Sequence, residues 1–165
     1  MELFDFLTHS QFGECVFTML VSMLPIIELR GGLPFGVALG LPYYLAFTAA
    51  VIGNLIPVPF IVVYIRRIFE LMRKYFPKLN GVVDKLEKKA NLKSQKVQKY
   101  QYIGLWLFVA IPLPGTGAWT GALAAAFLGM RLKNAMPAII LGVMTAGSIM
   151  LALTHVGINL FSSTI

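Results

Sequence analysis

Two stretches of the chain, Glu28-Leu-Arg-Gly-Gly-Leu-Pro34 and Pro112-Leu-Pro-Gly-Thr-Gly-Ala-Trp-Thr-Gly121, place proline and glycine inside long apolar runs. Both residue types interrupt helices, so each stretch predicts a break between two short helices. The flanking apolar pieces are about 8–13 residues long, or about 12–20 Å of helix. That length reaches only partway across a hydrocarbon core of about 30 Å. Each break therefore predicts a re-entrant hairpin, which enters the membrane and returns to the same side.

The composition of the whole chain indicates an integral membrane protein. Of its 165 residues, 58% are hydrophobic and 13% are charged, whereas a soluble domain has about 25% charged residues. Two segments, Tyr43–Ile65 and roughly Ala135–Leu160, are long enough to span a bilayer, which takes about 20 helical residues. We therefore expect a single all-α membrane domain.

The basic residues are concentrated between the two halves of the chain. Residues 66–99 hold 11 of the 14 lysines and arginines. Short basic segments stay on the cytoplasmic side during insertion, so this arm is predicted to be cytoplasmic. Its apolar pattern predicts a helical hairpin, and its first part is expected to lie on anionic lipid headgroups. Nucleic acid is not expected as a partner, because the apolar flanks already explain the charge bias.

The charges of the remaining loops distinguish two topologies. Four ordinary spans would place Arg131 and Lys133 outside and the acidic N-terminus inside, against the positive-inside tendency. Two re-entrant hairpins return Arg131 and Lys133 to the cytoplasm and leave both termini outside. The charges thus favour a first repeat over residues 1–65, the arm over 66–99, and a second repeat of opposite orientation over 100–165.

A weak internal similarity supports this inverted repeat. Gly32 and Gly36 align with Gly117 and Gly121 at a shift of 85 residues, with the same small-xxx-small spacing in each pair. That spacing also serves close helix packing, which is its purely structural interpretation. Inverted repeats with broken helices are characteristic of secondary transporters. Two tips meeting near the midplane would create one polar site.

Glu28 and Arg30 are the only charged residues between Cys15 and Ile65. Either one costs at least about 2.5–3.5 kcal/mol in the apolar zone. They form either a structural pair or a site in which Glu28 exchanges a proton and Arg30 binds an anion. Half-helices expected to begin near Pro34 and Ala118 would present free N–H groups to an anionic ligand. The predicted substrate-binding residues are Glu28, Arg30, Gly31, Gly32, Pro34, Asn54, Pro112, Pro114, Gly115, Thr116, Gly117, Trp119 and Gly121.

Several other chemistries are not expected. His9 and His155 lack companion ligands at metal spacing. Pro-Gly-Thr-Gly is not followed by the Gly-Lys-Ser/Thr of a nucleotide-binding loop. No cofactor, no metal and no enzymatic activity are therefore predicted.

The two motifs, with the basic arm between them, resemble the prokaryotic family of small multidrug export proteins. That family looks distantly related to the DedA/VTT superfamily, whose members resemble one another in having paired re-entrant hairpins. The resemblance covers nearly the whole chain, and it implies a membrane transporter with both hairpin tips at the site. It also implies substrates such as polyprenyl phosphates and dependence on the proton-motive force. A second membrane acid expected of DedA proteins is missing here.

The sequence thus predicts a gradient-coupled or facilitative transporter of the cell membrane for an anionic or lipid-linked substrate. One alternative is an exporter of cationic or lipophilic drugs, and another is a membrane assembly partner that transports nothing. The expected partners are membrane lipids and a coupling ion, proton or sodium. A homodimer is left open by the small size of the chain, although no motif indicates it.

Overall fold

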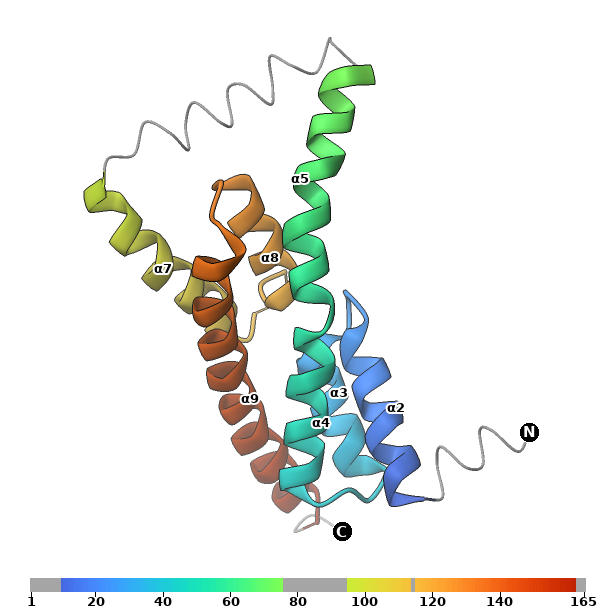
Figure 1. The fold of residues 1–165 in the computed structure, drawn as a ribbon. Coiled ribbons are helices and arrows are strands. Elements are labelled where there is room, and N and C mark those ends of the chain that lie inside the picture. The colour runs from blue at the N-terminus through green and yellow to red at the C-terminus, as the bar shows by residue number, and fades with distance from the viewer. Residues whose placement is uncertain (1–9, 76–94, 114, 163–165) are drawn as a thin grey trace. The chain divides into compact units, whose positions relative to one another are not determined.

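The computed structural model describes residues 10–75, 95–113 and 115–162, and all regular secondary structure in these residues is helical. The all-α prediction is confirmed for this part of the chain. Most of the predicted hairpin of the basic arm, residues 76–94, lies outside the described residues. The helices are α2 (Gln11–Met23), α3 (Glu28–Ala38), α4 (Tyr43–Leu55), α5 (Pro57–Tyr75), α7 (Gln95–Ala110), α8 (Ala118–Phe127) and α9 (Leu132–Ser162) (Figure 1).

The described residues form two compact units, each with its own core. Unit 1 contains α2, α3, α4 and the part of α9 from Val143 onward. Unit 2 runs from Pro57 to Gly142 and contains α5, α7, α8 and the start of α9. Unit 1 therefore consists of the α2–α3 hairpin, the following helix α4 and the end of α9. Unit 2 consists of the α7–α8 hairpin, the start of the following helix α9, and α5.

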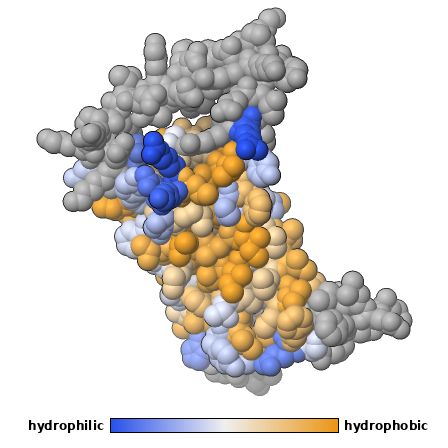
Figure 2. Space-filling model, in the orientation of Figure 1, coloured by the Kyte–Doolittle hydropathy of each residue, from blue (hydrophilic) through white to orange (hydrophobic). Residues whose placement is uncertain are grey.

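Two helical stretches are long and apolar enough to cross a membrane, Tyr43–Ile65 and Leu132–Ile158. Both predicted spans are confirmed by these criteria, and the second begins three residues earlier than expected. Large apolar side chains are exposed in both units, for example Ile26 at 94% in unit 1 and Leu141 at 57% in unit 2. Figure 2 shows hydrophobic residues over much of the face in view. Water would disfavour such a surface, whereas lipid would cover it.

The sequence predicts helix irregularities at Gly53, Pro57 and Pro59 in the first span and at Gly142 and Gly147 in the second, and this prediction is correct in the first span and wrong in the second. Between α4 and α5 the chain is interrupted at Ile56, just before Pro57. In contrast, α9 continues without a break through Gly142 and Gly147. These two glycines serve packing: a Cβ on Gly142 would lie 2.6 Å from the Cβ of Val109, so only hydrogen fits there.

The first hairpin also has a shorter tip than predicted. Helix α3 begins at Glu28 and contains Pro34 in its interior, so no half-helix begins near Pro34. The tip is limited to residues 24–27, where the N–H of Glu28 already donates to the carbonyl of Leu24 at 2.9 Å. Proline fits the helical φ and removes one donor, so a single proline does not end the helix here. In the second hairpin α8 begins at Ala118 as predicted.

Helices α3 and α8 end in the same way. Gly40, at φ +108°, donates its N–H to Val37 at 3.0 Å, and the N–H of Leu41 donates to Gly36 at 3.1 Å. Eighty-nine residues later Gly129, at φ +67°, donates to Ala126 at 3.0 Å, and Met130 donates to Ala125 at 2.9 Å. Each is a Schellman cap, with its glycine in a conformation that L side chains rarely adopt and with a buried Leu41 or Met130 after it.

The close backbone approaches recur at the same interval. A Cβ on Gly53 would meet the backbone of Met19, and 89 residues later one on Gly142 would meet the carbonyl oxygen of Trp106 at 3.1 Å. Gly32 faces Ser22 as Gly121 faces Val109. The residues that these glycines contact, Met19 and Ser22 in α2 and Trp106 and Val109 in α7, are 87 residues apart. The interval increases to 89 after the tips, because the second tip is two residues longer than the first. These close approaches match Gly32 to Gly121, whereas the shift of 85 residues in the sequence pairs Gly32 with Gly117.

Candidate functional site

The buried polar side chains of the described residues all lie in unit 1. They are Thr18, Ser22, Glu28 and Asn54, with exposed fractions of 0%, 0%, 4% and 2%. We call these four residues the polar cluster. Ser22 and Thr18 come from α2, Glu28 begins α3, and Asn54 lies in the last turn of α4. Because α3 and α4 are joined by a tight turn and run antiparallel, Glu28 and Asn54 lie at the same end of unit 1 (Figure 1).

The positions that lie 87 or 89 residues further along the chain are apolar or glycine. They are Leu105, Val109, Gly117 and Val143, at the intervals of 87 and 89 residues set by the caps and close approaches. Leu105, Val109 and Val143 are buried to the same degree as their counterparts. Buried polar side chains thus occur at only one position of each pair, and two of them, Thr18 and Ser22, also pack against Gly36 and Gly32.

Glu28 has an unusual backbone conformation. Its φ is +50°, and it is the only residue other than glycine with a positive φ among the described residues. Its counterpart Gly117 also has a positive φ, +136°. Glycine adopts such angles without strain, whereas for other residues this region costs about 1–2 kcal/mol. Strain of this kind is concentrated at functional sites. A buried acid held where the second repeat has glycine is therefore a strong candidate for function.

Asn54 contributes an unpartnered acceptor. Its side-chain Oδ1 is buried and has no hydrogen-bond partner among the described residues. The same is true of the Oγ1 of Thr18. Ser22 is satisfied, since its hydroxyl donates to the carbonyl of Thr18 at 2.7 Å. Pro57 and Pro59 follow Asn54 and have no N–H, so they cannot donate to the carbonyls of Gly53 and Leu55. An unpartnered buried acceptor costs about 1–3 kcal/mol, which a bound ligand would recover.

The other residues predicted for the first tip are helical. Arg30 is half-buried in α3 and interacts electrostatically with Glu28. Gly31 and Gly32 lie on α3 where a Cβ would strike Ile27 and Ser22, so both have a packing role. Pro34 is half-buried in the same helix. Of the predicted residues of the first repeat, the structure brings Glu28, Arg30 and Asn54 to one end of unit 1.

The second tip is a loop held together by its own threonine. The hydroxyl of Thr116 lies 2.7 Å from the carbonyl oxygen of Ile111 and 2.9 Å from that of Leu113, within donating distance of both. The N–H of Leu113 in turn donates to this hydroxyl at 3.3 Å. Thr116 therefore shapes the loop, which was not predicted. Among the other residues predicted for this tip, Gly115 is exposed at φ +82° and Gly117 is the buried N-cap of α8. Pro112 and Trp119 are half-buried, and Gly121 packs on Val109. Pro114 lies outside the described residues.

Two members of the polar cluster were missed by sequence reasoning. Thr18 and Ser22 lie four residues apart on α2 and face Gly36 and Gly32 on α3. The signal in the sequence was the spacing: Thr18 and Ser22 are four positions apart, and so are Gly32 and Gly36. The expectation that both tips form one site concerns both units and stays a prediction. The cluster itself offers a carboxylate, an amide and a hydroxyl to a ligand, a chemistry of hydrogen bonding and charge.

A comparison with protein-family models matches residues 28–149 to the family of small multi-drug export proteins. No curated protein and no solved structure matches the chain. The matched segment begins at Glu28 and covers well over half of the chain, including the polar residue Asn54, both Schellman caps and the whole second tip. The resemblance to this family is confirmed: the chain belongs to the family of small multi-drug export proteins.

Proposed function

We propose that the protein is a membrane transporter whose ligand site is built on Glu28 and Asn54, the two members of the polar cluster that lie at one end of unit 1. The observation that carries this proposal is the difference between the repeats: the first repeat buries four polar residues where the second has Leu105, Val109, Gly117 and Val143. Polar groups in an apolar environment are costly and are usually functional in membrane proteins. The family and the two apolar helices support the membrane location.

The proposed substrate is anionic or lipid-linked, with a headgroup like that of a polyprenyl phosphate. Arg30 would supply the countercharge for the phosphate, and the helix that carries it starts at this end of unit 1. Glu28 beside it would exchange a proton or hold sodium as a coupling ion, with the unpartnered oxygen of Asn54 as a further acceptor. A second candidate is export of cationic drugs, which the family label and the buried carboxylate of Glu28 favour.

Ligand-induced stabilisation separates these functions. Purified protein in detergent is heated with and without a short-chain polyprenyl phosphate, and in parallel with a cationic amphiphile. A ligand that binds the folded state adds about 2.7 kcal/mol at a hundredfold excess over its Kd. An increase in Tm with the phosphate that is lost in Arg30→Ala, but kept in Arg131→Ala, supports the anionic substrate. An increase only with the amphiphile supports drug export.

A variant of Glu28 distinguishes a transport residue from a structural one. Glu28→Gly places at φ +50° the residue that tolerates this angle, so the strain of about 1–2 kcal/mol is relieved while the carboxylate is removed. A transport site predicts an unchanged or higher Tm together with loss of ligand-induced stabilisation. A structural Glu28–Arg30 pair predicts a lower Tm instead, and a swap to Glu28→Arg with Arg30→Glu would then restore it. If neither ligand stabilises any variant, an assembly partner is the better description.

The similar caps and close approaches of the two repeats support the proposed inverted repeat with two re-entrant hairpins. Its topology is tested with single cysteines at positions 132 and 85, in a Cys15→Ser background. Both Leu132→Cys and Lys85→Cys are expected to react only with a reagent on the cytoplasmic side. Reaction of position 132 from the outside would support four ordinary spans.

A further inference from the structure

Unit 2 contains a groove between α7 and the beginning of α9. Its volume is about 490 Å³. Gly142 of α9 packs against Trp106 and Val109 of α7, and the groove is lined by residues that precede these in both helices. The two helices therefore run in the same direction along the groove. The lining residues are Tyr102, Ile103 and Trp106 from α7 and Lys133, Asn134, Pro137, Ala138 and Leu141 from α9.

The groove is polar at one end and apolar along the rest of its length. Lys133 and Asn134 lie in the first turn of α9, and Pro137 and Leu141 follow one and two turns later. Because a helix rises about 1.5 Å per residue, Leu141 lies about 12 Å from Lys133 along the axis. A phospholipid has the same sequence of features, with a charged headgroup followed by an acyl chain.

The charge at the polar end selects the headgroup. Lys133 is exposed, Arg131 is exposed two residues before it, and the described residues that line the groove include no carboxylate. The ring of Pro137 has no N–H to donate to the carbonyl of Lys133, so this carbonyl can accept a hydrogen bond from a headgroup hydroxyl. A cation and an acceptor together suit a phosphate that carries hydroxyl groups.

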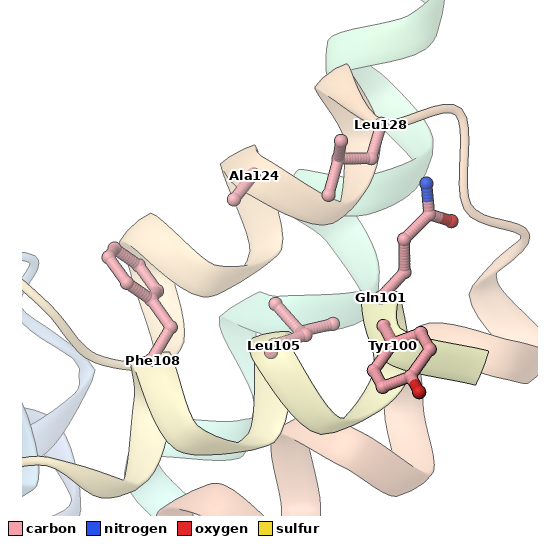
Figure 3. A pocket seen from close by; sticks show the side chains of 7 residues that line it. Tyr100, Gln101, Leu105, Phe108, Ala124 and Leu128 are labelled. Carbon is pink, nitrogen blue, oxygen red and sulfur yellow. The ribbon is translucent and has the colours of Figure 1, made fainter. Parts of the chain in front are cut away.

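A second groove of unit 2 provides a comparison. It lies between α7 and α8 and has a volume of about 340 Å³, and none of the described side chains that line it is charged (Figure 3). Its lining residues are Tyr100, Gln101, Gly104, Leu105, Phe108, Ala124 and Leu128. Both grooves offer apolar walls to an acyl chain, but among the lining residues that the structure describes a cation occurs in the α7–α9 groove alone. Selectivity for headgroup charge is therefore expected in one groove and not in the other.

We propose that the α7–α9 groove binds an anionic phospholipid, with its phosphate at Lys133 and an acyl chain along Trp106, Pro137 and Leu141. This site is separate from the polar cluster and goes beyond the proposed transport function. One basic residue near an anionic headgroup contributes about 1 kcal/mol, or about a fivefold preference over a zwitterionic lipid.

The two tryptophans of the chain allow a direct test. In Trp119→Phe the full chain has Trp106 as its single tryptophan, and this residue lines the groove. The protein is reconstituted in phosphatidylcholine vesicles that contain a small fraction of lipid with brominated chains, which quenches tryptophan on contact. We expect brominated phosphatidylglycerol to quench Trp106 with about fivefold higher apparent affinity than brominated phosphatidylcholine. In Trp106→Phe, where Trp119 emits, both lipids should quench equally.

Charge variants complete the test. Lys133→Gln in the Trp119→Phe background should reduce the preference to about one, whereas Arg67→Gln, which removes an exposed cation outside the groove, should leave it unchanged. If Trp119→Phe proves unstable, Trp119→Tyr replaces it. Equal quenching of Trp106 by both lipids would overturn the proposal, because the groove would then hold bulk lipid. A preference that persists in Lys133→Gln would also overturn it, since the selecting charge would lie elsewhere. Neither result affects the Tm assays of the transport site.

Discussion

The contact between Gly53 and α2 gives the sharpest stability prediction. A Cβ added at Gly53 would lie 2.8 Å from the Cα of Met19 and closer still to its carbonyl oxygen. Ordinary contacts of a Cβ begin near 3.4 Å. The opposing atoms belong to the backbone, so no side-chain rotation can relieve the overlap. Gly53→Ala therefore has to separate α2 and α4 by more than about 0.6 Å, a shift that forfeits about a quarter to a half of the attraction between the atoms that it moves apart.

The size of the effect follows from two opposing contributions. Overpacking of this kind costs about 1–3 kcal/mol. Alanine recovers about 0.5–1 kcal/mol relative to glycine in a helix interior. The net loss of stability is therefore up to about 2.5 kcal/mol, which in a chain of this size lowers Tm by up to about 10 °C.

The matched control is Gly104→Ala. Gly104 is also inside a helix, but a Cβ there would meet nothing within 4 Å. The control retains only the gain in helix propensity, and its Tm should rise by about 1–4 °C. Both variants are melted in the same detergent with intrinsic fluorescence as the signal. A Tm of Gly53→Ala equal to or above that of Gly104→Ala would show that α2 and α4 do not approach as closely as described.

Three further changes test the caps, the second tip and the first hairpin. Gly40→Ala and Gly129→Ala should each lower Tm through a backbone strain of about 1–2 kcal/mol, although a Cβ meets nothing within 4 Å at either site; unchanged melting would argue against the Schellman caps. Thr116→Val should lose about 0.5–1.5 kcal/mol while Thr116→Ser retains the loop bonds, and equal melting of the two would exclude a structural hydroxyl. Gly32→Ala should be destabilising and partly rescued by Ser22→Gly, because the added methyl group would strike the Ser22 side chain; additive effects in the double-mutant cycle would refute this contact.

The sequence was sufficient to predict the parts of the fold that depend on length and composition. The two long apolar helices and the start of α8 at Ala118 follow from apolar runs and their proline and glycine breaks. The first tip was predicted too long, because Pro34 was taken as a helix boundary although a helix tolerates a single proline. The expected irregularities at Gly142 and Gly147 failed for a related reason, since glycine in a membrane helix often marks close packing.

The candidate site was predictable only in part. Glu28, Arg30 and Asn54 stand out as polar residues in apolar surroundings, and the structure brings them to one end of unit 1. The positive φ of Glu28 and the polar partners Thr18 and Ser22 depend on tertiary geometry that one sequence does not reveal. The register of the repeat was also out of reach, because it is set by caps and backbone contacts and not by identical residues.

The division of α9 between the units has a consequence for biosynthesis. Unit 2 is continuous in sequence and complete once Gly142 has been made, whereas unit 1 begins near the N-terminus and needs residues from Val143 onward. In unit 1 Gly147 packs against Phe47 and Leu29. The α2–α3 hairpin is synthesised first, but its unit is the last to be completed. Leu29 and Phe47 therefore acquire their contact with Gly147 only near the end of translation. A chain stopped at residue 142 would present these side chains to chaperones and membrane proteases, so nascent-chain truncations should be degraded faster than the full-length protein.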